Sequence, residues 1–496
     1  MRVSELVTID EVKSWNAGDL ITIKAGTGAG KSYFIKNNLY ALAKKDNKKI
    51  LMLIHRSDCI NQFQKEIEAD RKTDVIKLMT YQRLEAMYKK DAKLSFDQYQ
   101  YIVCDEFHYF MSDAAFNHYT DISLNTILNQ TNKIRIFMSA TGEYMQKFLV
   151  NYKKLTAKHY EIEIKFDFIK TLTFYHKDET LEKVAEQAIE KNQKMIFFIE
   201  SAAKAYHLYK QFKNVAMFNC SKSNANYYKY VDEEKINQML SNEKFDDLIL
   251  ITTTCMDAGV NLKDEELRHV ICDVKDIGTL TQCIGRKRIE KKDDHINLLI
   301  KSISNQVLGG IQTQLSRKRE KARFLKENSV DDYVNKYKRE FDYSHIVYDD
   351  SIGENDKLTK KVNDLIDFKF LTDAVEIDLI KANGEFGYSR YLAKRFNKSK
   401  FTTIEVDKKE QDLKDFLEDL VEQKLYKEEQ NQLINRVDLR VNGRQQKSYK
   451  KLNEGLQMIK LPFVIIKDID KQRKLENGTD NPNRDKTYWM VMKSLG

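Results

Sequence analysis

The chain has 496 residues and a formal net charge of +9, from 84 basic and 75 acidic side chains. Its length predicts about three or four domains of ~150 residues each, and the small positive excess is only a weak indication of a polyanionic partner. No apolar run approaches the ~18–20 residues of a membrane span, the first residues do not resemble a signal peptide, and the six cysteines form no CxxC pair. We therefore expect a cytoplasmic protein with reduced cysteines and no membrane partner.

A glycine-rich segment, AGTGAGKS at residues 25–32, lies between an apolar run at 20–23 and an apolar-periodic run that starts at Tyr33. Strand, glycine loop and helix form the context of a phosphate-binding loop, although Ala25 replaces the usual first glycine. In such a loop the backbone N–H groups and the helix N-terminus face one phosphate cluster. A plain glycine-rich turn is the alternative. The expected nucleotide contacts are Gly26, Thr27, Gly28, Ala29, Gly30, Lys31 and Ser32, with Lys31 at the β- and γ-phosphates and Ser32 at Mg²⁺.

The first 150 residues alternate between strand and helix patterns, which predicts a parallel sheet with helices on its faces. Further strands are expected at residues 49–54, 75–79, 101–104 and 134–138, each followed by polar residues. Ligands bind beyond the carboxyl ends of such strands. Residues 151–180 are indicated only as a charged connector.

Two carboxylates, Asp105 and Glu106, follow the strand at 101–104 directly. A carboxylate at the end of a buried strand is costly unless a cation meets it. We expect Asp105 to hold Mg²⁺ and Glu106 to orient or deprotonate the attacking water. Two solvated acids at the start of a loop are the alternative.

The order of the phosphate loop, DEFH at 105–108 and SAT at 139–141 resembles that of the nucleic-acid-dependent ATPases of helicase superfamily 2, such as phage- or mobile-element-type DEAD/DEAH-box proteins. The resemblance implies that Ser139 and Thr141 couple the ATP site to the nucleic-acid path. It also implies that four residues lie near the phosphates of the strand, namely His55, Arg56, Thr80 and Tyr81. The DExH-type box favours a processive translocase.

A second α/β lobe is predicted by strands at 195–199, 215–218, 248–252, 270–274 and 296–300. Residues 251–262 resemble helicase motif V, which implies strand contacts from Thr253 and Thr254 and a close approach of Gly259 to the nucleotide. Residues 282–288 resemble the QxxGRxxR of motif VI. This implies that Arg286, with Gln282 on the same helix face, reaches the γ-phosphate as an arginine finger. The family's second arginine falls on Ile289, and the nearest arginine, Arg288, is assigned to the nucleotide.

The remaining residues lie beyond the motifs of the family. Residues 304–345 form a helical pattern whose basic stretch at 317–326 is either a solvated face or a surface that follows a nucleic-acid strand. Residues 346–360 are a candidate linker. The last 65 residues are expected to form helix, turn, basic helix and β-hairpin, the order of a winged helix. Trp489 lies at a strand position typical of core.

Together these patterns predict an α/β fold with two tandem RecA-like parallel-sheet lobes, a helical region and a small α+β module. The expected domains are 1–165, 166–303, 304–430 and 431–496. The expected function is an ATP- and Mg²⁺-dependent helicase or translocase on nucleic acid, with DNA favoured over RNA. Two alternatives are a sequence-specific replication initiator or loader with an ATPase switch, and the ATPase subunit of a restriction, defence or remodelling assembly with protein partners.

Overall fold

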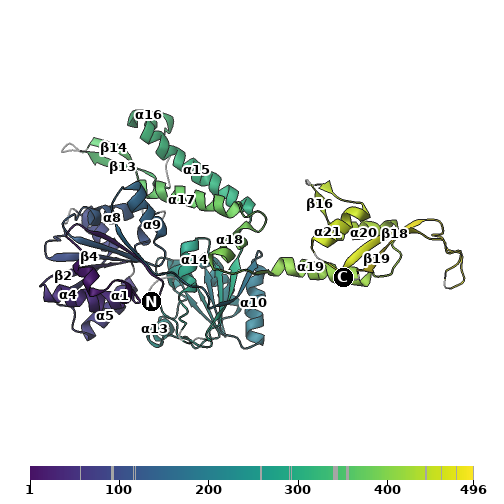
Figure 1. Cartoon of the computed structure of the whole chain (residues 1–496), viewed down its shortest axis with the longest axis horizontal. Helices are drawn as coiled ribbons and strands as arrows, with labels where there is room; N and C mark the ends of the chain where they lie inside the picture. The colour runs from purple at the N-terminus through teal and green to yellow at the C-terminus, as the bar shows by residue number, and fades with distance from the viewer. Residues whose placement is uncertain are drawn as a thin grey trace. The chain divides into compact units, whose positions relative to one another are not determined.

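The computed structural model places most of the chain and divides it into two compact units, Met1–Phe401 and Thr402–Gly496. We describe each unit by itself (Figure 1). The described residues are 1–55, 57–90, 94–114, 117, 119–256, 260–289, 291, 293–338, 344–352, 357–441, 444–459, 461–475 and 477–494.

The first lobe is built on a parallel sheet. Its strands are, in spatial order, β3 (Ile76–Thr80), β2 (Lys49–Ile54), β4 (Tyr99–Asp105), β5 (Ile134–Ser139), β1 (Leu20–Lys24) and β6 (Lys158–Glu161). β5 is buried along its whole length, which fits its nearly unbroken apolar sequence, since helices cover both faces of such a sheet. The strands expected from the sequence are present. The additional strand β6 lies in the segment that the sequence indicated only as a connector.

The helices of this lobe flank the sheet (Figure 1). They are α1 (Val3–Leu6), α2 (Ile9–Lys13), α3 (Lys31–Phe34), α4 (Tyr40–Lys45), α5 (Ser57–Ala69), α6 (Tyr81–Lys89), α7 (Tyr109–Ser112), α8 (Thr120–Leu128) and α9 (Glu143–Lys147), with π-helical turns at Ile35–Leu39 and Phe148–Tyr152. α1 is anchored on the phosphate loop, because the backbone N–H of Val3 donates to the Ala29 carbonyl at 2.8 Å. The loop is therefore braced from the N-terminal side.

The second lobe also contains a parallel sheet. Its strands within residues 169–301 lie in the order β7 (Ile169–Tyr175), β12 (Ile296–Lys301), β11 (His269–Asp273), β8 (Met195–Ile199), β10 (Ile249–Thr252) and β9 (Ala216–Asn219). Its helices are α10 (Glu179–Glu190), α11 (Ala202–Gln211), α12 (Ala225–Tyr228), α13 (Glu233–Asn242), the 3₁₀ turn Thr254–Met256 and α14 (Ile277–Ile284). The two lobes confirm the predicted tandem RecA-like fold. The predicted boundary between the two lobes, at residues 165 and 166, lies in the segment between β6 and β7.

The accessory region is mostly helical. It contains α15 (Asn305–Glu327), α16 (Val330–Lys336), the antiparallel hairpin β13 (Val347–Ile352) and β14 (Lys357–Val362), α17 (Asp364–Lys381) and α18 (Gly387–Arg395). The hairpin occupies the candidate linker, where Asp349 faces Lys360 across the strands at 2.6 Å. α15 and α17 run side by side in Figure 1. Part of the basic stretch on α15 is neutralised within the chain, since Arg319 and Lys326 pair with Asp367 at 2.8 and 2.9 Å.

Helix α17 contacts both lobes. Phe368 packs edge-on against Phe148 of the first lobe, with ring centroids 5.3 Å apart. Lys369 lies 3.0 Å from Asp373 and also interacts with Asp276, the N-cap residue of α14 in the second lobe. Burial by itself lowers the pKa of Lys369, but Asp373 and Asp276 raise it above its usual value. A largely buried ammonium group thus joins the accessory region to α14.

We predict that Lys369→Met lowers the free energy of unfolding by about 2 kcal/mol, because it removes a charge-assisted hydrogen bond to the partly buried Asp373. The urea unfolding transition measures this change. Lys381→Met, on the same helix, is the control and is expected to change stability by less than about 0.5 kcal/mol. Equal stability of the wild type and the Lys369 variant would show that the buried ion pairs do not support the packing of α17.

The C-terminal unit has its own apolar core. Its elements are β15 (Thr402–Thr403), α19 (Ile404–Asp419), α20 (Lys427–Val437), the short pair β16 (Arg440–Val441) and β17 (Arg444–Gln445), α21 (Tyr449–Met458), β18 (Phe463–Ile469) and β19 (Thr487–Lys493). Leu417 of α19 and Leu425 pack into the same core as Trp489, so this unit begins earlier than the expected residue 431. The burial of Trp489 confirms its predicted core position.

The elements of this unit include the predicted helix, turn, helix and hairpin, with the short β16–β17 pair between α20 and α21. Leu425, between α19 and α20, bridges to Trp489 on β19, as an edge strand between the first two helices would. α20, α21 and the β18–β19 hairpin follow. In the described part of the chain, no helix combines the length and the apolar character needed to cross a bilayer.

Candidate active site

The phosphate loop connects β1 to α3, which begins at Lys31. Gly28 and Gly30 have φ values of +84° and +86°, in the left-handed region that side chains disfavour. At Gly26 a Cβ atom would lie 3.3 Å from Ile164. Ala25 is fully buried in the core beneath the loop, where its methyl group fits, and this explains the departure from the usual glycine.

Two acidic residues follow β4 beside this loop. Nζ of Lys31 lies 3.5 Å from Oε1 of Glu106 and donates to the Ala25 carbonyl at 2.9 Å. Burial, and then the charge of Glu106, raise the pKa of Asp105 to about 7. Burial by itself raises the pKa of Glu106, but Lys31 and His108 hold it below its usual value. Glu106 also has a strained φ of +50°, a feature that is typical of functional sites.

These carboxylates make the site suitable for a divalent cation. The raised pKa of Asp105 indicates a buried acid for which Lys31 alone supplies too little positive charge. Mg²⁺ binds proteins through one or two carboxylates together with substrate phosphates and water. Ser32 lines the same cavity as Asp105, so the two side chains fit such an ion.

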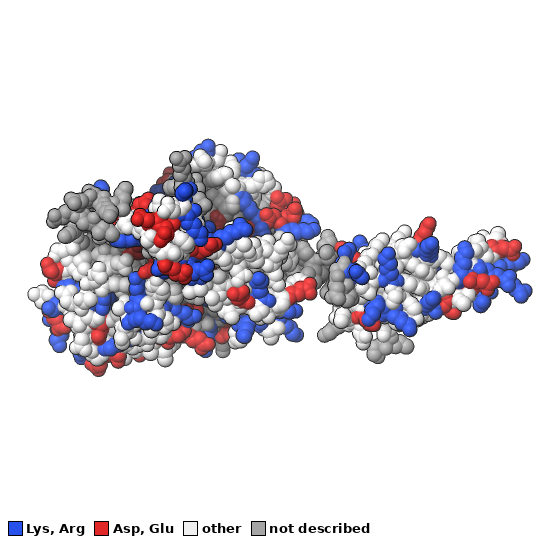
Figure 2. Space-filling view, turned by 90° about the horizontal axis from the view of Figure 1, so that it is seen from above, with Lys and Arg blue, Asp and Glu red and all other residues white. Residues whose placement is uncertain are grey.

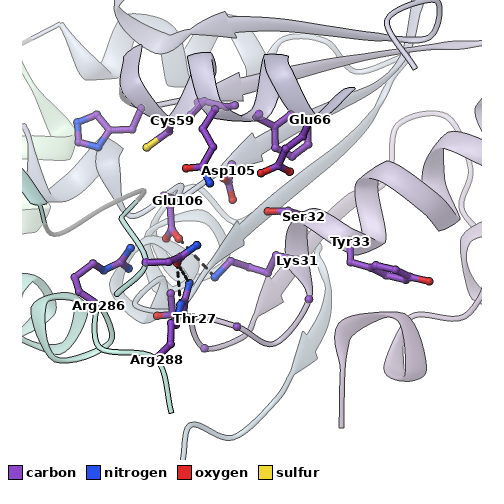
Figure 3. Close-up of a pocket in the computed structure, with 18 residues that line it drawn as sticks. Thr27, Lys31, Ser32, Tyr33, Cys59, Glu66, Asp105, Glu106, Arg286 and Arg288 are labelled. Atoms are coloured by element: carbon purple, nitrogen blue, oxygen red, sulfur yellow. Dashed lines mark hydrogen bonds and ion pairs between the residues drawn. The ribbon is translucent and has the colours of Figure 1, made fainter. Parts of the chain in front are cut away.

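A cavity of about 310 Å³ separates the phosphate loop from the second lobe. Asp105 and Glu106 line it from the first lobe, and Asn261, Arg286 and Arg288 line it from the second (Figure 3). The lobes approach closely here, because a Cβ at Gly285 would lie 2.7 Å from Oγ1 of Thr27. Groups from both lobes therefore face one small cavity.

Among the described residues no carboxylate lies within ion-pair distance of the two arginines, and Glu106 and Glu243 act on Arg288 only at longer range. Arg286 donates to the carbonyls of Gln282 and Val260 at 3.1 and 3.2 Å, and Arg288 donates to Oδ1 of Asn261 at 2.8 Å. Burial, and then the positive charge of Arg286, lower the pKa of Arg288 to about 10. A buried and a partly buried guanidinium group that repel each other beside a phosphate loop form a site suited to a polyphosphate.

A chain of hydrogen bonds connects the acids to the second lobe. Nε2 of Gln282 lies 2.8 Å from Nε2 of His108 and 3.0 Å from Oγ1 of Thr141. The other ring nitrogen of His108, Nδ1, faces Oγ of Ser139 at 2.8 Å. Ser139 in turn donates to Oε2 of Glu106 at 3.2 Å. Movement of α14 therefore changes the surroundings of Glu106.

Comparison with known proteins finds a match for part of the first lobe. Residues 64–144 match the family model of the type III restriction enzyme, res subunit, and this segment includes DEFH and SAT. The match is confined to this segment of the first lobe. No curated protein matches the chain.

Three solved helicase structures are similar to the chain. Saccharomyces cerevisiae Dbp5 bound to RNA and ADP BeF3 is 15% identical, with a TM-score of 0.46 over 61% of this chain and 85% of that one. Mycobacterium smegmatis helicase Lhr bound to ssDNA and AMP-PNP is 15% identical, with a TM-score of 0.43, and the match covers 60% of this chain and 46% of that one. Escherichia coli DEAH/RHA helicase HrpB is 13% identical, with a TM-score of 0.43, and the match covers 64% of this chain and 46% of that one.

The fold brings most predicted nucleotide residues together. Gly26, Thr27, Gly28, Gly30, Lys31, Ser32, Asp105, Glu106, Arg286 and Arg288 line the cavity. Ala29 does not line the cavity in this way; its backbone carbonyl accepts the hydrogen bond from Val3 that anchors α1. Gln282, Ser139 and Thr141 form the hydrogen-bonded chain behind the cavity. Gly259 lies outside the described residues.

The predicted nucleic-acid contacts are only partly accessible. His55 and Thr80 line a large groove between the lobes. The predicted contact of Tyr81 with the strand is wrong, because its side chain is fully buried. The ring stacks on Tyr109 at 4.8 Å between centroids, and the hydroxyl donates to the Asp105 carbonyl. The predicted contact of Thr253 with the strand is also wrong, because only 4% of the surface of this residue is exposed to solvent. Thr254 is partly exposed, and Arg56 lies outside the described residues.

Two functional candidates, His108 and Asn261, were not assigned from the sequence. His108 connects Gln282 to Ser139, and Asn261 holds Arg288 toward the cavity. Both lie inside quoted motifs, His108 in DEFH and Asn261 in the motif V-like segment. The motif positions are the signal that could have indicated them.

Proposed function

We propose that this chain hydrolyses ATP between its two lobes and couples hydrolysis to movement along single-stranded nucleic acid. The observation that carries this proposal is the cavity in which the phosphate loop of one lobe faces Arg286 and Arg288 of the other. A nucleotide held by one lobe alone would not require two guanidinium groups of the other lobe in the same cavity.

In this mechanism the backbone N–H groups of residues 28–32 and the Lys31 ammonium bind the β- and γ-phosphates. Mg²⁺, held by Ser32 and Asp105, would neutralise phosphate charge. Glu106 orients the attacking water and accepts its proton, and its lowered pKa keeps it ionised for this role. Arg286 and Arg288 stabilise the charge that develops on the transferred phosphoryl group.

Loss of the γ-phosphate removes an anion that both lobes bind, so the lobes separate after hydrolysis. The chain from Gln282 through His108 and Ser139 to Glu106 transmits the lobe position to the catalytic acid. A motor on a polymer needs such a link, because each hydrolysis must coincide with a change of grip.

The groove of about 1360 Å³ between the lobes is the proposed path of the strand. It is formed at the carboxyl ends of strands of both sheets, where α/β proteins bind ligands. The solved relatives include one bound to RNA and one bound to ssDNA. We propose DNA as the favoured polymer and RNA as the alternative.

Turnover of ATP by the purified chain, without polymer and with single-stranded DNA, duplex DNA or RNA, tests the proposal. We expect single strands to raise kcat about tenfold or more, because ordering of an arginine finger contributes up to ~10³–10⁵ in rate. The stimulation should fall steeply with salt. Lys31→Ala controls for contaminating ATPases. Equal turnover in all four samples would contradict a nucleic-acid motor.

The C-terminal unit supports a second candidate, a sequence-specific initiator or loader with an ATPase switch. Its winged-helix order is accompanied by exposed basic side chains on the β18–β19 loop, visible at the far end of this unit in Figure 2. They are Lys471, Arg473, Lys474, Arg484 and Lys486. Footprinting on random and origin-like DNA separates the candidates, because a motor without site preference protects both uniformly.

A further inference from the structure

The groove proposed as the strand path contains few cations for a polyanion. Lys65 and Lys222 line it, together with the acids Asp113 and Glu233. The other described lining residues carry no carboxylate, ammonium or guanidinium group. Phosphate neutralisation by these residues supplies little affinity, so a second kind of contact is needed.

Tyr228 is the only aromatic residue of the tyrosine, phenylalanine or tryptophan type among the described lining residues. It ends the short helix α12 and is partly exposed. Its hydroxyl donates to Oε1 of Glu233 at 2.9 Å, and Nζ of Lys222 lies 5.6 Å from its ring centroid. The ring is therefore held in a fixed place in the groove wall, beside a cation.

The neighbouring tyrosines explain why this ring remains in the groove. Tyr230 stacks on Tyr206 of α11 with ring centroids 4.3 Å apart, and Tyr227 packs on the same ring at 5.6 Å. Tyr206 in turn packs on Phe218 of β9 at 5.8 Å. Because consecutive helical residues point about 100° apart, anchoring Tyr227 on Tyr206 directs Tyr228 elsewhere.

We propose that Tyr228 stacks on a base of the single strand in the groove, with Lys222 at a flanking phosphate. This inference rests on the proposed function and adds a contact to a base where the other predicted contacts are to phosphates. Aromatic stacking accepts every base, so this contact gives affinity for unpaired strands without sequence preference.

Binding of a fluorescent thymidine oligonucleotide and of an abasic oligomer of equal length to the full chain tests this inference. We expect the wild type to bind the base-bearing strand about tenfold more tightly, as the loss of one stacked base predicts. In Tyr228→Ala this difference should disappear, and in Tyr228→Trp it should remain. Tyr88→Ala removes an exposed tyrosine that does not line the groove; it is the matched control and should keep the difference. Thermal unfolding of each variant checks its fold.

The outcomes are distinct. Equal affinity of the wild type for the abasic and base-bearing oligomers, with ATP turnover still stimulated by both, overturns base stacking and leaves the proposed motor intact. A base preference that survives in a folded Tyr228→Ala variant also overturns the assignment. Absence of binding to either oligomer, together with unstimulated ATP turnover, overturns the proposed function itself.

Discussion

Glu106→Gln is expected to lower the stimulated kcat for ATP by about 10²–10⁴-fold, because the amide cannot accept the proton of the attacking water. ATP binding should persist, since the phosphate loop and Lys31 are unchanged. The fold should persist as well, because the amide has nearly the size of the carboxylate and removes the repulsion that adds to burial in raising the pKa of Asp105. Single-turnover hydrolysis and nucleotide binding, measured on the same preparation, check both expectations.

Glu186→Gln, an exposed glutamate on α10, is the matched control for this prediction and should hydrolyse ATP at the wild-type rate. Near-normal turnover of Glu106→Gln would remove this residue from the chemical step. Its lowered pKa and its strained backbone would then require another explanation.

The second large effect is expected from Arg286→Ala, which should lower stimulated turnover by about 10³-fold or more while ATP affinity changes by less than about tenfold. The guanidinium acts mainly on charge that develops in the transition state, so ground-state binding depends on it less. The structure supports separate roles in binding and in catalysis, because Lys31 and the loop amides, which bind the phosphates, belong to the other lobe.

Arg268→Ala removes an exposed arginine of the same lobe and is the control for the loss of a positive charge. Measurement of kcat and of the ATP dissociation constant separates the possible roles. A large loss of ATP binding with unchanged kcat would show that Arg286 anchors the nucleotide and does not act as a finger.

Strands with long apolar runs could be predicted because burial on both faces of a parallel sheet requires them. β5 and β8 are examples, each buried along its length. β6 was not predicted, since its sequence KHYE is polar and its pairing with β1 depends on the position of an edge. The β13–β14 hairpin was missed for a related reason, because its charged residues are paired across strands only after folding.

The candidate site shows the same limit. Lys31, Ser32, Asp105 and Glu106 could be placed because local motifs fix their backbone context. The position of Arg288 in the cavity depends on Asn261, which is distant along the chain. Tyr81 was assigned wrongly because a polar-looking segment at a strand end does not reveal that its ring stacks on Tyr109. The catalytic roles themselves stay predictions.

A structure of the full chain with ADP, beryllium fluoride, Mg²⁺ and a single-stranded oligonucleotide tests the central claim most directly. We predict that the phosphates lie on the N–H groups of residues 28–32 and that the Arg286 guanidinium contacts the fluoride group that mimics the γ-phosphate. A nucleotide bound by the first lobe alone, with Arg286 still on the carbonyls of Gln282 and Val260, would contradict it.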